Sequence, residues 1–183
     1  VEDFAARTAD LLTVTGGCVD GVTEGVAYAP WTELLWWLIR SIGRDALGDE
    51  RARLARLLPG IGEAAGEDPG RAALFEAVVE VLHRVSSERR LLVVVEDVHW
   101  IDPASRDLLA YVARNLRRLP LLLVMTVRTP GEPVEVREFL GELVRLGAGE
   151  LALAPLADGE AADVASLLAG WRIDGPEVRA VVE

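Results

Sequence analysis

The chain has 183 residues, with 30 acidic side chains against 19 basic ones and a net charge of −11. All 19 basic residues are arginine, so these residues hold neither a complete phosphate-binding loop of the G-x-x-x-x-G-K-[ST] type nor a catalytic lysine. The negative charge disfavours nonspecific binding to nucleic acid, and the 51% apolar content is too high for a disordered chain. No apolar run approaches the ~20 residues of a membrane span, so we expect no contact with a membrane.

Cysteine usage and the first residues indicate the kind of segment this is. Cys18 is the only cysteine, so no internal disulfide forms, which is typical of a reducing compartment and predicts a cytoplasmic location. The N-terminus lacks the order of a secretion signal, and residues 1–6 resemble the middle of a helix. We therefore expect a fragment or an excised domain of a longer protein.

The first half of the chain predicts one strand among several helices. A β-rich run at residues 11–18 ends in Gly16-Gly17, which we interpret as a turn that leads into a glycine-bearing loop. Apolar residues at helical spacing then predict helices at 31–42, at 49–58 before Pro59-Gly60, and at 71–86.

The second half alternates strands with helices. Uninterrupted apolar runs at 91–95 and 121–125 suit strands that are buried on both faces, and Asp102 with Pro103 predicts the start of a helix. Further patterns predict a helix at 134–146, an edge strand at 150–156 and a helix at 158–168. This alternation predicts an α/β fold with a parallel sheet and right-handed crossovers over residues 1–157, followed by a helical subdomain over 158–183.

Two adjacent carboxylates, Glu96 and Asp97, stand where a buried strand ends. Ligands of open α/β sheets bind beyond the carboxyl ends of the strands, and two like charges there are costly unless a cation compensates. A hydrated Mg²⁺ held together with nucleotide phosphates supplies such a cation. In this Walker B interpretation Glu96 holds the metal, usually through water, and Asp97 orients or deprotonates the attacking water. A strand that simply ends in two acids before a loop is the structural alternative.

A second polar strand end, Thr126-Val127-Arg128, follows the run at 121–125. Arg128 is suited to bidentate contact with a γ-phosphate, and Thr126 is a weaker candidate for the same sensing role. A surface ion pair is the simpler alternative for Arg128. His99 either orders the loop behind the acid pair, or senses the nucleotide, or is an ordinary hydrogen-bonded loop histidine.

These segments resemble the AAA-type ATPase domain of large LuxR-type transcriptional regulators, which belong to the STAND class of signal-transduction ATPases. The most specific part is the string Glu-Asp-x-His-Trp-x-Asp-Pro-Ala-Ser at 96–105, and weaker matches lie at 25–31, 107–115, 121–128 and 153–156. The resemblance implies a P-loop NTPase-like parallel sheet flanked by helices, with ATP and Mg²⁺ as ligands of the complete protein. It also implies self-association driven by ATP, and contact with DNA only through a domain outside these residues.

Two family elements have no counterpart here. The Walker A loop with the strand before it is absent, and the Gly-x-Pro motif of the helical lid does not occur, since Gly175-Pro176 differs in position and spacing. The chain therefore matches only the metal and sensor side of an ATP site, and we expect it to bind ATP weakly or not at all on its own. Because the missing strand would lie between 121–125 and 150–156, we expect those two strands either to pair directly or to be completed by self-association.

The predicted function is a partial ATP-binding switch domain of a LuxR-family regulator, whose complete protein is a weak Mg²⁺-dependent ATPase. Two alternatives stay open. One is a non-catalytic signalling or scaffold domain with a degenerate ATPase fold, and the other is an ATPase module joined to a different effector, such as a cyclase or kinase.

Overall fold

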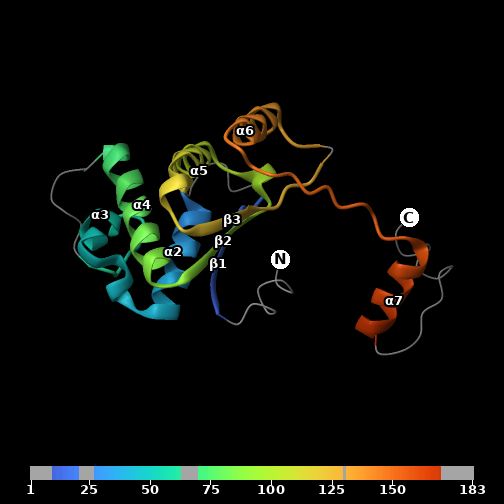
Figure 1. Ribbon diagram of the computed structural model, residues 1–183, viewed down its shortest axis with the longest axis horizontal. Helices are drawn as coiled ribbons and strands as arrows, with labels where there is room; N and C mark the ends of the chain where they lie inside the picture. Colours follow the sequence, from blue (N-terminus) through green and yellow to red (C-terminus); the bar gives the residue numbers. More distant parts are fainter. Residues whose placement is uncertain (1–9, 21–26, 63–69, 130, 170–183) are drawn as a thin grey trace. The chain divides into compact units, whose positions relative to one another are not determined.

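A computed structural model describes residues 10–20, 27–62, 70–129 and 131–169 of the chain (Figure 1). The chain divides into two units, residues 1–148 and residues 149–183. Residues 1–6, which resemble the middle of a helix, and the Gly175-Pro176 pair lie outside the described residues. The boundary that we predict at residue 157 stays a prediction.

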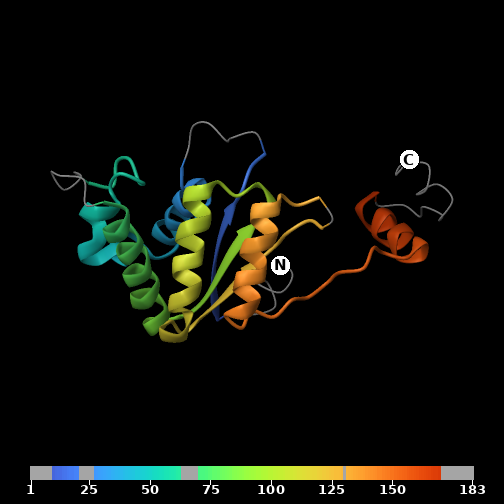
Figure 2. The same cartoon turned by 90° about the horizontal axis from the view of Figure 1, so that it is seen from above.

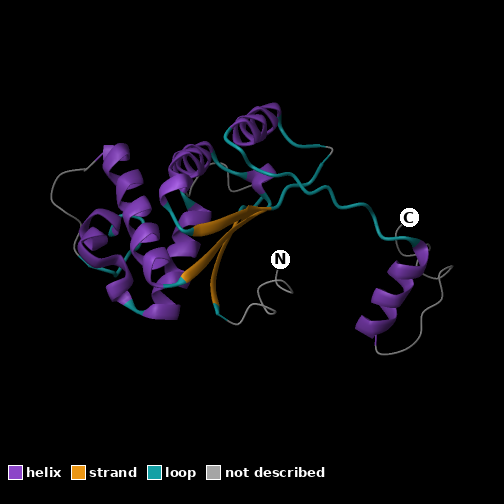
Figure 3. Ribbon diagram, in the orientation of Figure 1, coloured by secondary structure: helices purple, strands orange, loops and turns teal. Residues whose placement is uncertain are grey.

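A three-stranded parallel sheet is the centre of the first unit (Figure 3). The strands are β1 (Leu11–Gly17), β2 (Arg90–Glu96) and β3 (Leu121–Met125), in the order β1-β2-β3. Val93 of β2 lies opposite Val14 of β1 and Leu123 of β3. All three strands were predicted, and the parallel α/β class is confirmed.

The central strand β2 is apolar because both of its faces are buried. Its residues Leu91, Leu92, Val93, Val94 and Val95 are each at most 1% exposed. A strand that is covered on both faces needs no polar alternation, so the uninterrupted apolar run is the sequence signature of this position. The strand therefore carries Glu96 and Asp97 to the carboxyl edge of the sheet on a rigid support.

Helices connect and cover the strands. They are α2 (Ala29–Ile42), α3 (Arg51–Leu54), α4 (Gly70–Glu88), α5 (Pro103–Asn115) and α6 (Val134–Arg145), with short 3₁₀ turns η1 (Arg44–Glu50), η2 (Val98–Trp100) and η3 (Leu116–Arg118). Figure 2 shows α4, α5 and α6 side by side. The core joins apolar side chains of β2 to those of α2, α4 and α5. None of the described helices is long and apolar enough to cross a lipid bilayer.

Two local features fix where α2 and α5 begin. Asp102 caps α5 as predicted, because its Oδ1 accepts a hydrogen bond from the Ser105 backbone N–H at 2.9 Å, and Pro103 follows at the first helical position. The indole N–H of the fully buried Trp31 donates to the Ser105 carbonyl at 3.1 Å, which ties α2 to the start of α5. Both helices are thereby anchored near the carboxyl edge of the sheet.

Two predictions in the first half need correction. Gly16 and Gly17 are the last two residues of β1, paired with Val95 and Glu96, rather than a turn. The predicted helix at 49–58 is only the four residues of α3, since residues 55–57 form a turn and Gly48, before α3, interrupts the helical backbone with a φ of 50° and a ψ of −133°. Glycine alone adopts such a backbone without strain.

The edge strand predicted at 150–156 is wrong. In the second unit this segment has no regular secondary structure, and Leu151 and Leu153 are each 85% exposed. It is followed by helix α7 (Asp158–Ala169), which was predicted. Alternating leucines favour an extended chain, but a strand exists only where a neighbour completes its hydrogen-bond ladder. How the free edge of β3 is completed, by this segment or by self-association, stays a prediction.

Candidate functional site

The polar ends of β2 and β3 meet at the carboxyl edge of the sheet. The Thr126 N–H donates to the Val95 carbonyl at 3.0 Å, and the Val98 N–H donates to the Thr126 carbonyl at 2.9 Å. The Asp97 N–H donates to the Thr126 hydroxyl oxygen, also at 3.0 Å. These three bonds continue the pairing of the strands beyond their ends. Asp97 is thus brought beside Thr126 and Arg128.

Asp97 turns the chain at the end of β2 with a left-handed backbone, φ 55° and ψ 44°. Aspartate is one of the few residues besides glycine that tolerate this conformation. The Thr126 hydroxyl is used to hold the turn, because it accepts the Asp97 N–H. Thr126 therefore positions the acid directly, while its predicted part in sensing phosphate stays a prediction.

Arg128 follows the end of β3, and its side chain lies beside Asp97. Its Nε is 3.8 Å from Asp97 Oδ1, and its guanidinium carbon is 5.5 Å from the ring centre of Trp100. The Arg128 side chain is 74% exposed, so the ion pair is screened by water and adds little stability. Arg128 is thus an exposed cation that lies next to the carboxylate and over an aromatic face.

Glu96 and the end of β1 form the other half of this edge. The Glu96 carbonyl accepts the Cys18 N–H at 2.9 Å, and the Gly17 N–H donates to Glu33 Oε2 on α2 at the same distance. The side chains of Glu96 and Asp97 are both partly exposed. Two hard oxygen donors that face water suit Mg²⁺, which keeps several waters and takes one or two carboxylates from the protein.

Among the described residues, the acid pair is not part of a larger metal-binding cluster. In the described part of the chain, no group of three or more His, Cys, Asp or Glu side chains is placed to hold an ion. The donor set at this edge therefore fits an ion whose remaining ligands are water and phosphate, and it does not resemble a structural zinc site.

Cys18 is buried beside the acidic edge, with 6% of the residue exposed. Burial, followed by the negative charges of Asp102 and Asp97, raises the pKa of the Cys18 thiol from 9.0 to about 12. A raised pKa means that the folded state favours the neutral thiol, which is the less reactive form.

We expect Cys18 to react with a disulfide reagent at pH 8 at least about tenfold more slowly in the folded chain than in urea. Because the pKa is raised on folding, the neutral thiol stabilises the fold below pH 9, and this contribution is lost as the pH rises from about 9 towards 12. Urea denaturation at pH 8 and pH 10.5 measures the loss, which should be smaller in Cys18→Ala. Equal reaction rates in the folded and unfolded chain would contradict the burial of the thiol.

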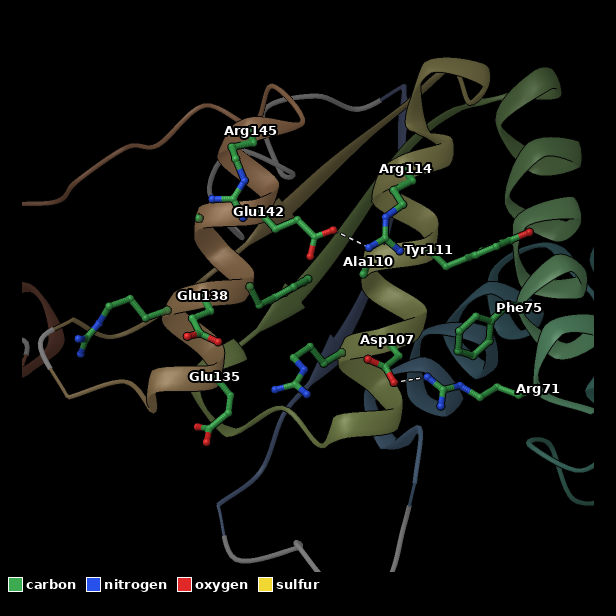
Figure 4. A pocket seen from close by; sticks show the side chains of 14 residues that line it. Arg71, Phe75, Asp107, Ala110, Tyr111, Arg114, Glu135, Glu138, Glu142 and Arg145 are labelled. Atoms are coloured by element: carbon green, nitrogen blue, oxygen red, sulfur yellow. Dashed lines mark hydrogen bonds and ion pairs between the residues drawn. The ribbon is translucent and has the colours of Figure 1, made fainter.

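An open groove of about 960 Å³ lies between α5 and α6 (Figure 4). Its charges largely compensate one another, since Arg71 pairs with Asp107 and Arg114 of α5 pairs with Glu142 of α6. None of the site residues predicted from the sequence lines this groove. The carboxyl edge of the sheet is therefore the better candidate site.

The sequence did not identify several residues that shape this edge. Cys18 was noticed only for its redox compartment, and Glu33 was not noticed, although it binds the end of β1. Trp100 entered only as part of the string at 96–105, and its stacking with Arg128 depends on the η2 turn. The only hint of this contact in the sequence is that Trp100 follows the acid pair closely along the chain.

Comparisons with known proteins agree with this architecture. A family model described as an AAA ATPase domain matches residues 1–124. An uncharacterized protein of Rhizobium meliloti (strain 1021) is 46% identical over 66 residues, which are 35% of this chain and 6% of that protein. No solved structure gives a significant match. The chain thus spans only a small part of this relative, whereas the family model covers most of the chain and all three strands up to Val124. The chain belongs to the AAA ATPase domain family, as the family model shows and as the parallel sheet with its polar edge agrees.

Proposed function

We propose that this domain supplies the metal-binding and γ-phosphate-sensing side of an ATP site in a signal-transduction ATPase. Glu96 holds Mg²⁺ through water, Asp97 orients the attacking water, and Arg128 contacts the γ-phosphate, with Thr126 holding Asp97 and serving as a second sensor. The observation that carries the proposal is the junction of the two strand ends, in which Asp97 lies within 3.8 Å of Arg128 and is hydrogen-bonded to Thr126.

The charges at this junction support the proposal. An acid pair next to an exposed arginine provides one site for a cation and one for an anion, which are the two charges of Mg-ATP. Bound Mg²⁺ supplies charge neutralisation for the phosphates. With no lysine in the 183 residues, the loop that cradles the phosphates has to come from residues other than these.

We further propose that the complete protein is a LuxR-type regulator of the STAND class, in which ATP binding drives self-association. The string at 96–105 and the free edge of β3 within the described sheet support this context. Residues 1–157 would then form the partial nucleotide-binding core and residues 158–183 the start of a helical lid. DNA would be contacted by another domain of that protein.

Calorimetry of Mg-ATP binding tests the site. A protein that joins this domain to a G-x-x-x-x-G-K-[ST] loop is expected to bind Mg-ATP, and Arg128→Ala should weaken binding about 10- to 100-fold, because a charge-assisted contact is lost. The 183-residue chain alone should bind weakly or not at all.

Arg118→Ala is the matched control for this experiment. Arg118 is exposed in η3, before β3 and hence at the opposite end of that strand from Arg128. Its removal changes the net charge equally without touching the carboxyl edge. Equal weakening by the two variants would refute the role of Arg128 and leave only a general electrostatic effect.

A further inference from the structure

His99 is enclosed in the loop between the acid pair and α5. It belongs to the η2 turn, its side chain is only 10% exposed, and its ring centre lies 4.3 Å from that of Trp100. The left-handed turn at Asp97 places it there, since it folds the chain back directly after β2. A polar ring that is nine-tenths buried in a surface loop requires a reason.

The imidazole of His99 lies against two residues of the candidate site, Arg128 and Asp97. The Arg128 backbone N–H donates to His99 Nδ1 at 3.5 Å, and Asp97 Oδ1 lies 3.9 Å from the same nitrogen. Nδ1 is therefore the hydrogen-bond acceptor of this contact. Among the described residues Nε2 has no hydrogen-bond partner, and the buried ring is therefore anchored only through Nδ1 and its stacking.

The side-chain contacts of Arg128 do not by themselves fix its position. Its guanidinium is mostly exposed, and an exposed ion pair does not fix a long side chain. The backbone of Arg128 follows the last strand pairing, in a segment without regular secondary structure. Of the hydrogen bonds that the structure gives Arg128, the one to His99 fixes its backbone, and stacking on Trp100 then limits where the guanidinium can go.

We propose that His99 is the positioning residue for Arg128. Through Nδ1 it holds the Arg128 backbone, so that the guanidinium stays over Trp100 and within reach of the Asp97 carboxylate. This inference rests on the proposed function for the contact of Arg128 with the γ-phosphate, but the positioning itself is a property of the nucleotide-free chain.

Amide hydrogen exchange by NMR, in the 183-residue chain without nucleotide, tests the proposal. The variants are His99→Asn, whose side-chain oxygen can take the place of Nδ1, His99→Gln, whose amide reaches the place of Nε2 instead, and His99→Ala. We expect the Arg128 amide to exchange slowly in the wild type and in His99→Asn, and about 3- to 10-fold faster in His99→Gln and His99→Ala. Rescue by Asn but not by Gln separates a contact through Nδ1 from mere filling of space.

Internal controls distinguish positioning from a general loss of structure. The amides of Thr126 and Val98, which bond to the Val95 and Thr126 carbonyls, should keep their protection in every variant, and His83→Gln on the exposed side of α4 should change nothing. The proposal would be overturned if the Arg128 amide exchanged at the same rate in all variants, or if His99→Asn lost its protection as His99→Gln does. It would also be overturned if the Thr126 amide lost protection in parallel with that of Arg128. Since no nucleotide is present, these outcomes leave the roles of Glu96 and Asp97 untouched, whereas failed ATP binding would leave the positioning of Arg128 intact.

Discussion

Asp97→Asn is expected to lower ATP turnover by at least about 100-fold in a protein that joins this domain to a Walker A loop, with little change in Mg-ATP affinity. If Asp97 orients or deprotonates the attacking water, the loss of its charge removes an interaction that matters mainly in the transition state. Steady-state ATP hydrolysis with calorimetry of Mg-ATP binding separates the two effects.

Asparagine is the right substitution because of the backbone at this position. Asp97 has a φ of 55°, and asparagine tolerates that left-handed conformation about as well as aspartate does, whereas alanine would add strain. The Asp97 N–H can still donate to the Thr126 hydroxyl in the variant. A fall in turnover can therefore be assigned to the carboxylate rather than to a distorted turn.

Asp102→Asn is the matched control for Asp97→Asn. Asp102 carries the same charge and contributes, like Asp97, to the raised pKa of Cys18, so it lies near the same edge. Asparagine caps helices as well as aspartate, so the start of α5 should be kept. Unchanged turnover in Asp102→Asn supports a specific role for Asp97, while similar losses in the two variants would show that only the local negative charge matters.

The sequence predicted the sheet well because its strands carry strong local signals. The apolar runs before Glu96 and Thr126 are long enough to require burial, and the two polar ends then meet by the geometry of parallel strands. The cap at Asp102 was predictable for a similar reason, since it depends on residues three positions apart. The predicted site residues could therefore be brought together before any side-chain position was known.

Features that depend on contacts between distant segments were missed or predicted wrongly. Whether residues 150–156 form a strand depends on a neighbouring edge, which no local pattern encodes. The position of His99 against Arg128 follows from the turn at Asp97 and from a partner 29 residues away. Gly16 and Gly17 suggested a turn because the local sequence does not reveal that the Pro30 backbone lies against the strand at Gly16.

Gly16→Ala is expected to destabilise the first unit by about 3 kcal/mol or more, because overpacking against a backbone cannot be relieved by a rotamer change. A Cβ at Gly16 would lie 2.0 Å from the carbonyl oxygen of Pro30 and 2.8 Å from its carbonyl carbon, at the start of α2. That segment is tied down, since the adjacent Trp31 is fully buried and bonded to the start of α5. Urea denaturation followed by circular dichroism should show a clearly lower midpoint.

The neighbouring glycine provides the control that isolates this contact. A Cβ at Gly17 meets only Glu33 Oε2, at an ordinary 3.7 Å, and the Gly17 N–H can keep its bond to that carboxylate. Gly17→Ala should therefore leave stability unchanged or raise it by up to about 1 kcal/mol, because alanine restricts the unfolded chain more than glycine does. Equal midpoints for the two variants would mean that α2 can move away from β1 at little cost. In that case the buried bond between Trp31 and Ser105 would not fix the start of α2 against the sheet, and the close approach at Gly16 would be incidental to the fold.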